Sequence, residues 1–372
     1  MAITDRLKYA RQRAALTLAQ VNERTGIGDS SVCEFESGKR EPSLSQLQAL
    51  ARVYRRSIAF FFSEGPLPQE VVLWREQPSE AAGEIEAQFL RLCEQYHNLE
   101  MWIDDPLPIR LPQAEGDVER FDYTRAEILA KRVRDELQLG DRPGQGLLRV
   151  LEEVCGVKVF HLKFEPTGTA ASAVSGTFGA AVLLNSANAR WRRNFDLAHE
   201  LFHLLTWDLF RPSNGQNAAG REAPKPEEKL AQCFACNLLM PGDAVRITID
   251  GRTTDGKITF ESLYDVAREF DVSIDALLWR MHFLCGRGSD AADQTKRDIE
   301  RAKALTGLLG ERHGDEPEVY PARYRALAVK ALRRGEMSTG RFAEYLGISR
   351  QQAMKYTEQE VADDEEVQVS PA

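Results

Sequence analysis

The chain has 372 residues and a formal net charge of −9, with 43% hydrophobic and 28% charged residues. This length allows two or three domains with their own cores, and the composition excludes a disordered or fibrous chain. No stretch reaches the roughly 18 uncharged apolar residues of a bilayer span, and the first residues lack the apolar core of a signal peptide. We therefore expect a cytoplasmic protein without membrane contact, whose six cysteines are reduced.

Residues 1–65 are predicted to form an all-helical N-terminal domain. Turn signals at Gly26-Ile27-Gly28 and Ser37-Gly38-Lys39 separate short helices over residues 3–62. Residues 1–62 hold ten Lys or Arg and six Asp or Glu, so this segment is basic within an acidic chain. It can therefore face nucleic-acid phosphates.

Residues 66–105 are predicted to form a linker and a helix, after the boundary signal Gly65-Pro66-Leu67-Pro68. A helix over residues 79–103 carries an apolar stripe. The stripe can pack on the next domain or on a second subunit, so a homodimer contact is one interpretation of it. Its members are Ile85, Phe89, Leu92, Tyr96 and Leu99.

Residues 106–290 are predicted to form a small α+β domain in a chain that is otherwise helical. The strand over residues 176–185 is either an ordinary core strand or a place where an extended peptide pairs with the sheet edge. A helix that starts at Glu227 ends before Pro241-Gly242. The expected elements are helices over residues 125–137, 146–155, 188–207, 227–240 and 259–285, and strands over residues 157–162 and 176–185.

Residues 291–372 are predicted to form a helical C-terminal region with an acidic, disordered tail that contains Asp363-Asp364-Glu365-Glu366. Two or three helices are expected over residues 323–358. Within them, residues 337–349 have the pattern of a truncated helix-turn-helix, for which a packing or regulatory role is favoured over DNA reading.

The strongest chemical signal is His199-Glu200-Leu201-Phe202-His203. Residues four apart on an α-helix differ by about 40° in direction, so His199 and His203 can share one metal ion, and the spacing suits Zn²⁺. Glu200 lies about 100° from His199, where its carboxylate can act on a water without being a ligand. The pattern predicts a zinc-dependent peptidase with Glu200 as the general base. A pair of structural core histidines is the alternative.

A catalytic zinc takes three protein ligands and keeps one open position, so a third ligand must come from another segment. The helix that opens at Glu227-Glu228 is the best source. A face count slightly favours Glu227, which lies between the directions of Leu230 and Phe234 on the apolar stripe. Periodicity alone does not distinguish the two glutamates.

The run Leu-Ala-His-Glu-Leu-Phe-His-Leu-Leu at residues 197–205, followed by Glu-Lys-Leu-Ala-Gln-Cys-Phe-Ala-Cys-Asn-Leu-Leu-Met-Pro at residues 228–241, resembles the ImmA/IrrE family of metallopeptidases. The resemblance covers about residues 125–284. It implies a zincin-like α+β domain of the HExxH type, with His199, His203 and Glu228 as zinc ligands and Glu200 as the catalytic residue.

Three positions need separate comment. The family usually has glycine where this chain has Phe202, so we expect this ring to narrow or reshape the substrate cleft. Cys233 and Cys236 have the spacing of a metal or redox pair. We interpret them as small buried thiols, because free cysteine behaves as a hydrophobic residue and family members carry small residues there.

Residues 6–62 resemble the XRE family of helix-turn-helix domains, through Leu16-Thr17, Gly26-Ile27 and the run Glu-Ser-Gly-Lys-Arg-Glu-Pro-Ser at residues 36–43. In such domains the second helix of the motif enters the major groove with its N-terminal residues at the bases. Asn22 stands where a small alanine is normally buried between the two helices. The predicted base contacts are Asp29, Ser30, Ser31 and Glu34, with Lys39 and Arg40 near phosphates.

The two acids on this reading face oppose phosphate attraction, although a carboxylate can accept a hydrogen bond from cytosine. A docking or dimerisation module that no longer binds DNA is the alternative interpretation of the N-terminal domain.

Together the two resemblances predict a regulatory zinc metallo-endopeptidase that binds DNA through its N-terminal domain. Its protein substrate is expected to be a transcriptional repressor or a similar regulatory protein, in stress, phage or mobile-element control. Two alternatives stay open: a transcriptional regulator whose zinc domain senses without proteolysis, and an antitoxin-like binding protein.

Overall fold

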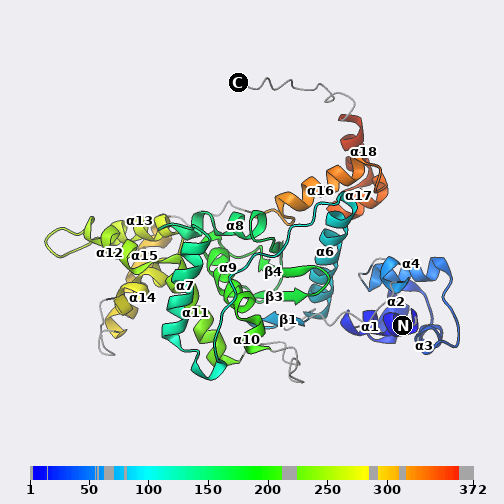
Figure 1. The fold of residues 1–372 in the computed structure, drawn as a ribbon, viewed down its shortest axis with the longest axis horizontal. Coiled ribbons are helices and arrows are strands. Elements are labelled where there is room, and N and C mark those ends of the chain that lie inside the picture. The colour runs from blue at the N-terminus through cyan, green and yellow to red at the C-terminus, as the bar shows by residue number, and fades with distance from the viewer. Residues whose placement is uncertain are drawn as a thin grey trace.

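A computed structural model describes residues 3–359, apart from residues 15, 55, 57, 63–70, 79–81, 212–223, 285–291 and 310–315. Helices surround one small mixed sheet, so the predicted class, α+β and mostly helical, is confirmed (Figure 1). The predicted boundary at residues 65–68 and the predicted acidic tail lie outside the described residues. Within the described part of the chain, no helix has the length and apolarity of a membrane span.

The N-terminal domain is a bundle of five short helices around its own core. Thr17 and Gln20 form a reciprocal capping box that starts the second helix, and Gly26, with φ of +71°, ends it in the left-handed conformation. The chain then turns directly into the third helix, which gives the predicted helix-turn-helix. The helices are α1 (Ile3–Arg13), α2 (Leu18–Thr25), α3 (Asp29–Ser37), α4 (Leu44–Val53) and α5 (Ile58–Phe62).

The sheet has the strand order β1-β3-β4-β2, in which β4 pairs with β3 antiparallel and with β2 parallel. Because β4 is paired on both sides, it is an ordinary core strand, and the alternative of peptide pairing at its edge is wrong. The strands β1 and β3 were not predicted, since one has only four residues and the other has a small-residue sequence without clear alternation. The strands are β1 (Val71–Trp74), β2 (Lys158–Leu162), β3 (Ala170–Ser175) and β4 (Gly179–Asn185).

One face of the sheet packs on the larger helical core. The predicted helix over residues 259–285 is broken at Asp271, whose φ of +55° ends one helix before the next begins. The helix α12 was not predicted, and α15 lies in the C-terminal region that was predicted to be helical. The elements on this side are the short helices η1 (Val118–Arg120) and η2 (Pro143–Gln145), and α7 (Tyr123–Glu136), α8 (Leu147–Glu153), α9 (Arg190–Leu205), α10 (Trp207–Phe210), α11 (Lys225–Leu239), α12 (Gly242–Asp250), α13 (Phe260–Phe270), α14 (Ile274–Leu284) and α15 (Ala292–Leu309).

The opposite face of the sheet packs on α6 (Ala82–Ile103), and α16 (Ala322–Arg333), α17 (Thr339–Leu346) and α18 (Arg350–Gln359) complete the same hydrophobic core. The stripe predicted on α6 is buried against the sheet and α16 of the same chain. Residues of α17 join this core, which favours the packing role predicted for residues 337–349.

The N-terminal domain lies beside one end of α6, whereas α16 to α18 lie at the other end (Figure 1). Among the described residues, three ion pairs join the domain to α6, and Ala87 of α6 belongs to the core of the domain. The helix α6 therefore links the N-terminal domain to the sheet through these ion pairs and through Ala87. The pairs are Arg13–Glu86 at 3.0 Å, Arg24–Glu84 at 2.6 Å, and Arg56–Glu94.

A buried carboxylate joins α6 to both the sheet and α16. Glu100 lies 3.0 Å from the Lys158 ammonium and 3.2 Å from the Arg323 guanidinium, and the Glu100 and Lys158 side chains are only 5% and 3% exposed. Removal of the carboxylate leaves a buried ammonium without its partner.

Glu100→Ala is expected to lower the free energy of unfolding by about 3–5 kcal/mol, the usual cost of breaking one side of a buried ion pair. Urea denaturation measures it. The matched control is Glu344→Ala, which removes the 59% exposed partner of Arg91 between α6 and α17 and is expected to cost at most about 1 kcal/mol. Equal losses in the two variants would contradict the assignment.

Candidate metal centre

The helix α9 is fixed near its start by a buried carboxylate. Asp196 accepts hydrogen bonds from Asn188 at 3.0 Å, from Arg192, and from Arg75 after β1 at 3.1 Å. Burial raises the pKa of Asp196 to about 6, while the two guanidiniums act in the opposite direction. This network sets which face of α9 meets the sheet and which meets α11.

The two histidines of α9 face the first turn of α11. The Nε2 atoms of His199 and His203 lie 3.3 Å apart. The carboxylate of Glu228 spans both, with Oε2 at 3.0 Å from His199 Nε2 and Oε1 at 3.2 Å from His203 Nε2. One ligand atom from each of the three residues lies within 4.8 Å of the others. Burial lowers the pKa of His199 to about 4, so its imidazole is neutral, the form that binds metals. Burial acts in the same direction on His203, but the bonds to Glu227 and Glu228 outweigh it and raise the pKa of His203 to about 9.

These separations fit a tetrahedral zinc. An ion with ligand bonds of about 2.0–2.1 Å places neighbouring ligand atoms about 3.3–3.4 Å apart, close to the spacings between the two histidines and Glu228. Two imidazoles and one carboxylate are also a donor set that suits Zn²⁺. The residues therefore fit the ion that the sequence pattern implies.

Glu227 occupies a different place from its neighbour. Its Oε1 lies 2.8 Å from Nδ1 of His203, on the opposite side of the ring from Glu228, and Arg211 donates to both of its oxygens at 2.7 and 2.9 Å. Burial alone would raise the pKa of Glu227, but the bonds to His203 and Arg211 outweigh it and lower the pKa. Such a carboxylate orients the imidazole ring and makes its other nitrogen more basic.

Glu200 is fully buried beside this cluster. Neither of its carboxylate oxygens has a hydrogen-bond partner among the described residues. Burial raises the pKa of Glu200 to about 7, while the charge of His203 and the Ser172 hydroxyl act against this rise. A buried carboxyl without a partner is costly, and it is the arrangement expected of a group that exchanges protons with a substrate.

The ring of Phe202 does not border an open cleft. Its side chain is completely buried, in contact with the rings of Phe121, Phe210 and Phe234. The ring therefore does not narrow a cleft directly, and a reshaped substrate cleft stays a prediction. A glycine at this position would leave a cavity between α9, α10 and α11.

The two cysteines of α11 show no metal or disulfide pairing among the described residues. Cys233 lies 3.8 Å from the carbonyl of Tyr123 and accepts a bond from Asn237. Burial raises the pKa of Cys236 to about 11, so it stays a thiol. The interpretation as partly buried structural thiols is therefore favoured.

The residues predicted to contact DNA gather at α3 and the turn after it. Asp29, Ser30, Lys39 and Arg40 are exposed, whereas Ser31 and Glu34 are half-buried. The Arg40 guanidinium also lies over the ring of Phe35. Asn22 is exposed and not buried between α2 and α3, so its larger side chain does not separate the two helices.

Comparisons with known proteins agree with this two-part organisation. Residues 152–282 match the model of the IrrE N-terminal-like domain, family Peptidase_M78, and residues 7–61 match a helix-turn-helix family model. Over 70 residues the chain is 37% identical to the HTH-type transcriptional regulator PuuR of Escherichia coli (strain K12), and the same values hold for PuuR of Shigella flexneri. The aligned segment is 19% of this chain and covers only 38% of those regulators.

Zinc binding by single variants is expected to separate the roles of the two glutamates. Glu228→Gln, which removes the charged carboxylate facing both histidines, should abolish tight binding. Glu227→Gln should weaken it by about 10–100-fold, the usual effect of losing a group that supports a ligand. Competition with a chromophoric chelator measures both affinities. If Glu227→Gln is the more damaging change, the two assignments are reversed.

Proposed function

We propose that this chain is a DNA-binding regulatory zinc metallo-endopeptidase. It joins an XRE-type helix-turn-helix domain to an IrrE N-terminal-like, metallopeptidase-like domain. The observation that carries the proposal is the cluster of His199, His203 and Glu228, with the buried carboxyl of Glu200 beside it. The substrate class proposed is a transcriptional repressor or a similar regulatory protein.

In this proposal His199, His203 and Glu228 hold Zn²⁺, and Glu227 fixes the ring of His203. When bound, Zn²⁺ supplies Lewis acidity that polarises a peptide carbonyl and makes water more acidic. Glu200 takes the proton of the attacking water at its carboxylate and passes it to the leaving nitrogen. Its burial supports this role, because the raised pKa suits a group that must both accept and release a proton near neutral pH.

The N-terminal domain is proposed to bring the peptidase to DNA or to a DNA-bound partner. The exposed Lys39 and Arg40 support phosphate contacts, and the start of α3 offers Asp29, Ser30, Ser31 and Glu34 for base contacts. Contacts between cationic side chains and phosphates weaken as the salt concentration rises. The salt dependence of binding therefore separates phosphate contacts from base contacts.

A second candidate is a metal-dependent regulator that cleaves nothing. The observation that favours it is the burial of the site: the side chains of His199 and His203 are 1% exposed and Glu228 is 20% exposed. A peptide must reach these residues before it can be cut. Catalysis therefore needs an opening of this region, whereas sensing of a metal ion does not.

The two candidates are distinguished by Glu200→Gln. The variant keeps the three proposed ligands and the size of the side chain but removes the carboxylate that moves the proton. Co-expression with candidate repressor proteins, read by intact mass, is expected to give a cleaved partner with wild type only. The loss expected is at least 100-fold in rate, the typical contribution of a general base.

The control for that experiment is the zinc content and the DNA affinity of the variant, both of which should match wild type. If the wild-type chain holds zinc and cleaves no partner, the regulator without proteolysis is the better account. Equal cleavage by both forms would remove Glu200 from its proposed role.

Lys39→Ala and Arg40→Ala are expected to weaken binding to all DNA sequences alike, because contacts to phosphates carry no sequence information. Each should reduce the slope of log affinity against log salt by about 1. Fluorescence anisotropy at several salt concentrations measures this. Arg52→Ala, an exposed cation of α4, is the control for net charge. Unchanged DNA affinity in Lys39→Ala and Arg40→Ala would favour the interpretation of the N-terminal domain as a docking module.

A further inference from the structure

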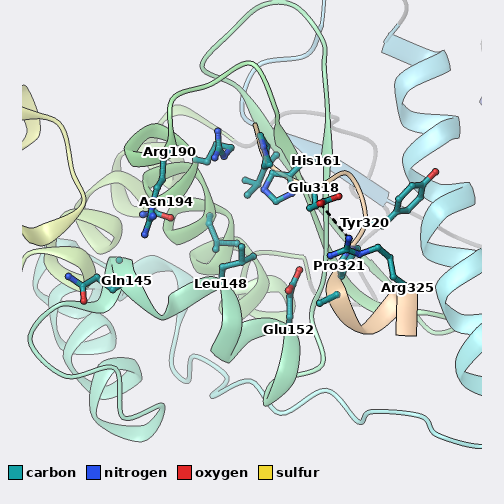
Figure 2. A pocket seen from close by; sticks show the side chains of 16 residues that line it. Gln145, Leu148, Glu152, His161, Arg190, Asn194, Glu318, Tyr320, Pro321 and Arg325 are labelled. Carbon is teal, nitrogen blue, oxygen red and sulfur yellow. Dashed lines mark ion pairs between the residues drawn. The ribbon is translucent and has the colours of Figure 1, made fainter. Parts of the chain in front are cut away.

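A cavity of about 340 Å³ lies between the metallopeptidase-like domain and the C-terminal region. Its walls come from η2 and α8, from the first half of α9, from β2 and β4, and from residues 317–325 at the start of α16. Figure 2 shows Arg190 and Asn194 on one side of this space and Glu318 and Arg325 on another, with Leu148 and Glu152 between them.

The cavity is separate from the candidate metal centre. Successive residues of a helix differ by about 100° in direction, so Arg190, which lines the cavity, lies about half a turn around α9 from His199. None of the proposed metal ligands lines the cavity. Ligand pockets in proteins measure about 300–1,000 Å³, so this volume fits a small metabolite and not a dinucleotide or a peptide.

The lining carries more arginines than carboxylates: Arg190, Arg193 and Arg325 contribute to the wall, together with Glu152 and Glu318. Arg190 also pairs with Asp271 at 2.8 Å, and Arg193 donates to the carbonyl of Asn188 at 2.6 Å, so each offers a ligand only its remaining N–H donors. Glu318 already pairs with Arg325 at 3.4 Å. A guanidinium has five N–H donors in a planar fork that matches carboxylate and phosphate groups, so one such pair leaves Arg325 with further donor capacity.

Two features reduce the electrostatic repulsion between the lining and a negatively charged ligand. The carboxyl of Glu152 is raised in pKa to about 8 by burial, assisted by the neighbouring charge of Glu153 and opposed by Arg325, so it is mostly neutral at pH 7 and can donate a hydrogen bond. Arg190 and Arg193 also belong to the first turn of the 16-residue helix α9, whose N-cap, Ala189, provides no side-chain cap. The positive end of the helix dipole therefore adds to the same wall.

We propose that this cavity binds a small metabolite carrying a carboxylate or phosphate group. The anionic group lies among Arg190, Arg193 and Arg325, and the apolar part lies against Leu148 and Leu197. Such a ligand contacts α9, which carries the candidate metal site, and the start of α16, which packs on α6. It therefore strengthens the docking of the C-terminal region on the metallopeptidase-like domain.

The test uses the full-length chain loaded with zinc, titrated calorimetrically with succinate and, separately, with inorganic phosphate, at constant ionic strength set by sodium chloride. Ala322→Trp places a large ring in the cavity from an exposed position, and Ala326→Trp is the matched control one turn further along α16, exposed and outside the lining. Arg325→Gln removes one of the cations without filling the space.

We expect saturable binding of at least one anion by wild type and by Ala326→Trp, loss of binding in Ala322→Trp, and about tenfold weaker binding in Arg325→Gln, as for loss of one charge-assisted hydrogen bond. Binding of succinate alone identifies a carboxylate ligand, and binding of phosphate alone a phosphorylated one. The proposal is overturned if neither anion binds wild type saturably, or if both the Ala322→Trp and Arg325→Gln variants bind as wild type does.

Discussion

The contact between α9 and the first turn of α11 is the constraint on which the rest of this chain depends. Two imidazoles one turn apart meet two adjacent carboxylates in a largely buried space, where each unpaired polar group costs free energy. Neighbours on a helix point about 100° apart, so Glu228 faces both rings while Glu227 reaches the outer nitrogen of His203. The positive end of the α11 dipole further stabilises both carboxylates. Any two of these buried groups alone would destabilise the fold, whereas the four together form a site for a cation.

Segments far apart in the sequence hold this contact in place. The strand β1 lies outside the residues that match the IrrE N-terminal-like domain, yet it pairs with β3, and Arg75 just after it binds Asp196 on α9. The second face of the sheet packs on α6 and on the start of α16, which also lie outside the matched residues. The helix α6 in turn forms ion pairs with the N-terminal domain. A continuous set of packed elements therefore runs from the helix-turn-helix domain to the candidate metal centre. The cavity beside α9 lies within the same set.

The parts of the fold that could be predicted from the sequence are those with local signals. The turn signals at Gly26 and Gly38, the apolar stripe of α6 and the proline after α11 marked helices that the structure contains. The strands β1 and β3 gave no such signal, because their pairing depends on partners about 100 residues away or on small residues that fit between two layers. The histidine spacing located the candidate site, but a face count could not separate Glu227 from Glu228, since the choice depends on how α11 is rotated against α9. The burial of Phe202 and the cavity at His161 likewise depend on packing between distant segments.

The central claim is that His199, His203 and Glu228 hold one zinc ion, and X-ray absorption spectroscopy of the zinc-loaded chain tests it most directly. The account predicts about one zinc per chain, surrounded by nitrogen and oxygen atoms at about 2.0–2.1 Å with the multiple-scattering signature of two imidazoles. In His203→Ala that signature should be lost together with the bound metal. A shell of sulfur at about 2.3 Å, as Cys233 and Cys236 would give, or zinc retained unchanged in His203→Ala, would contradict the account.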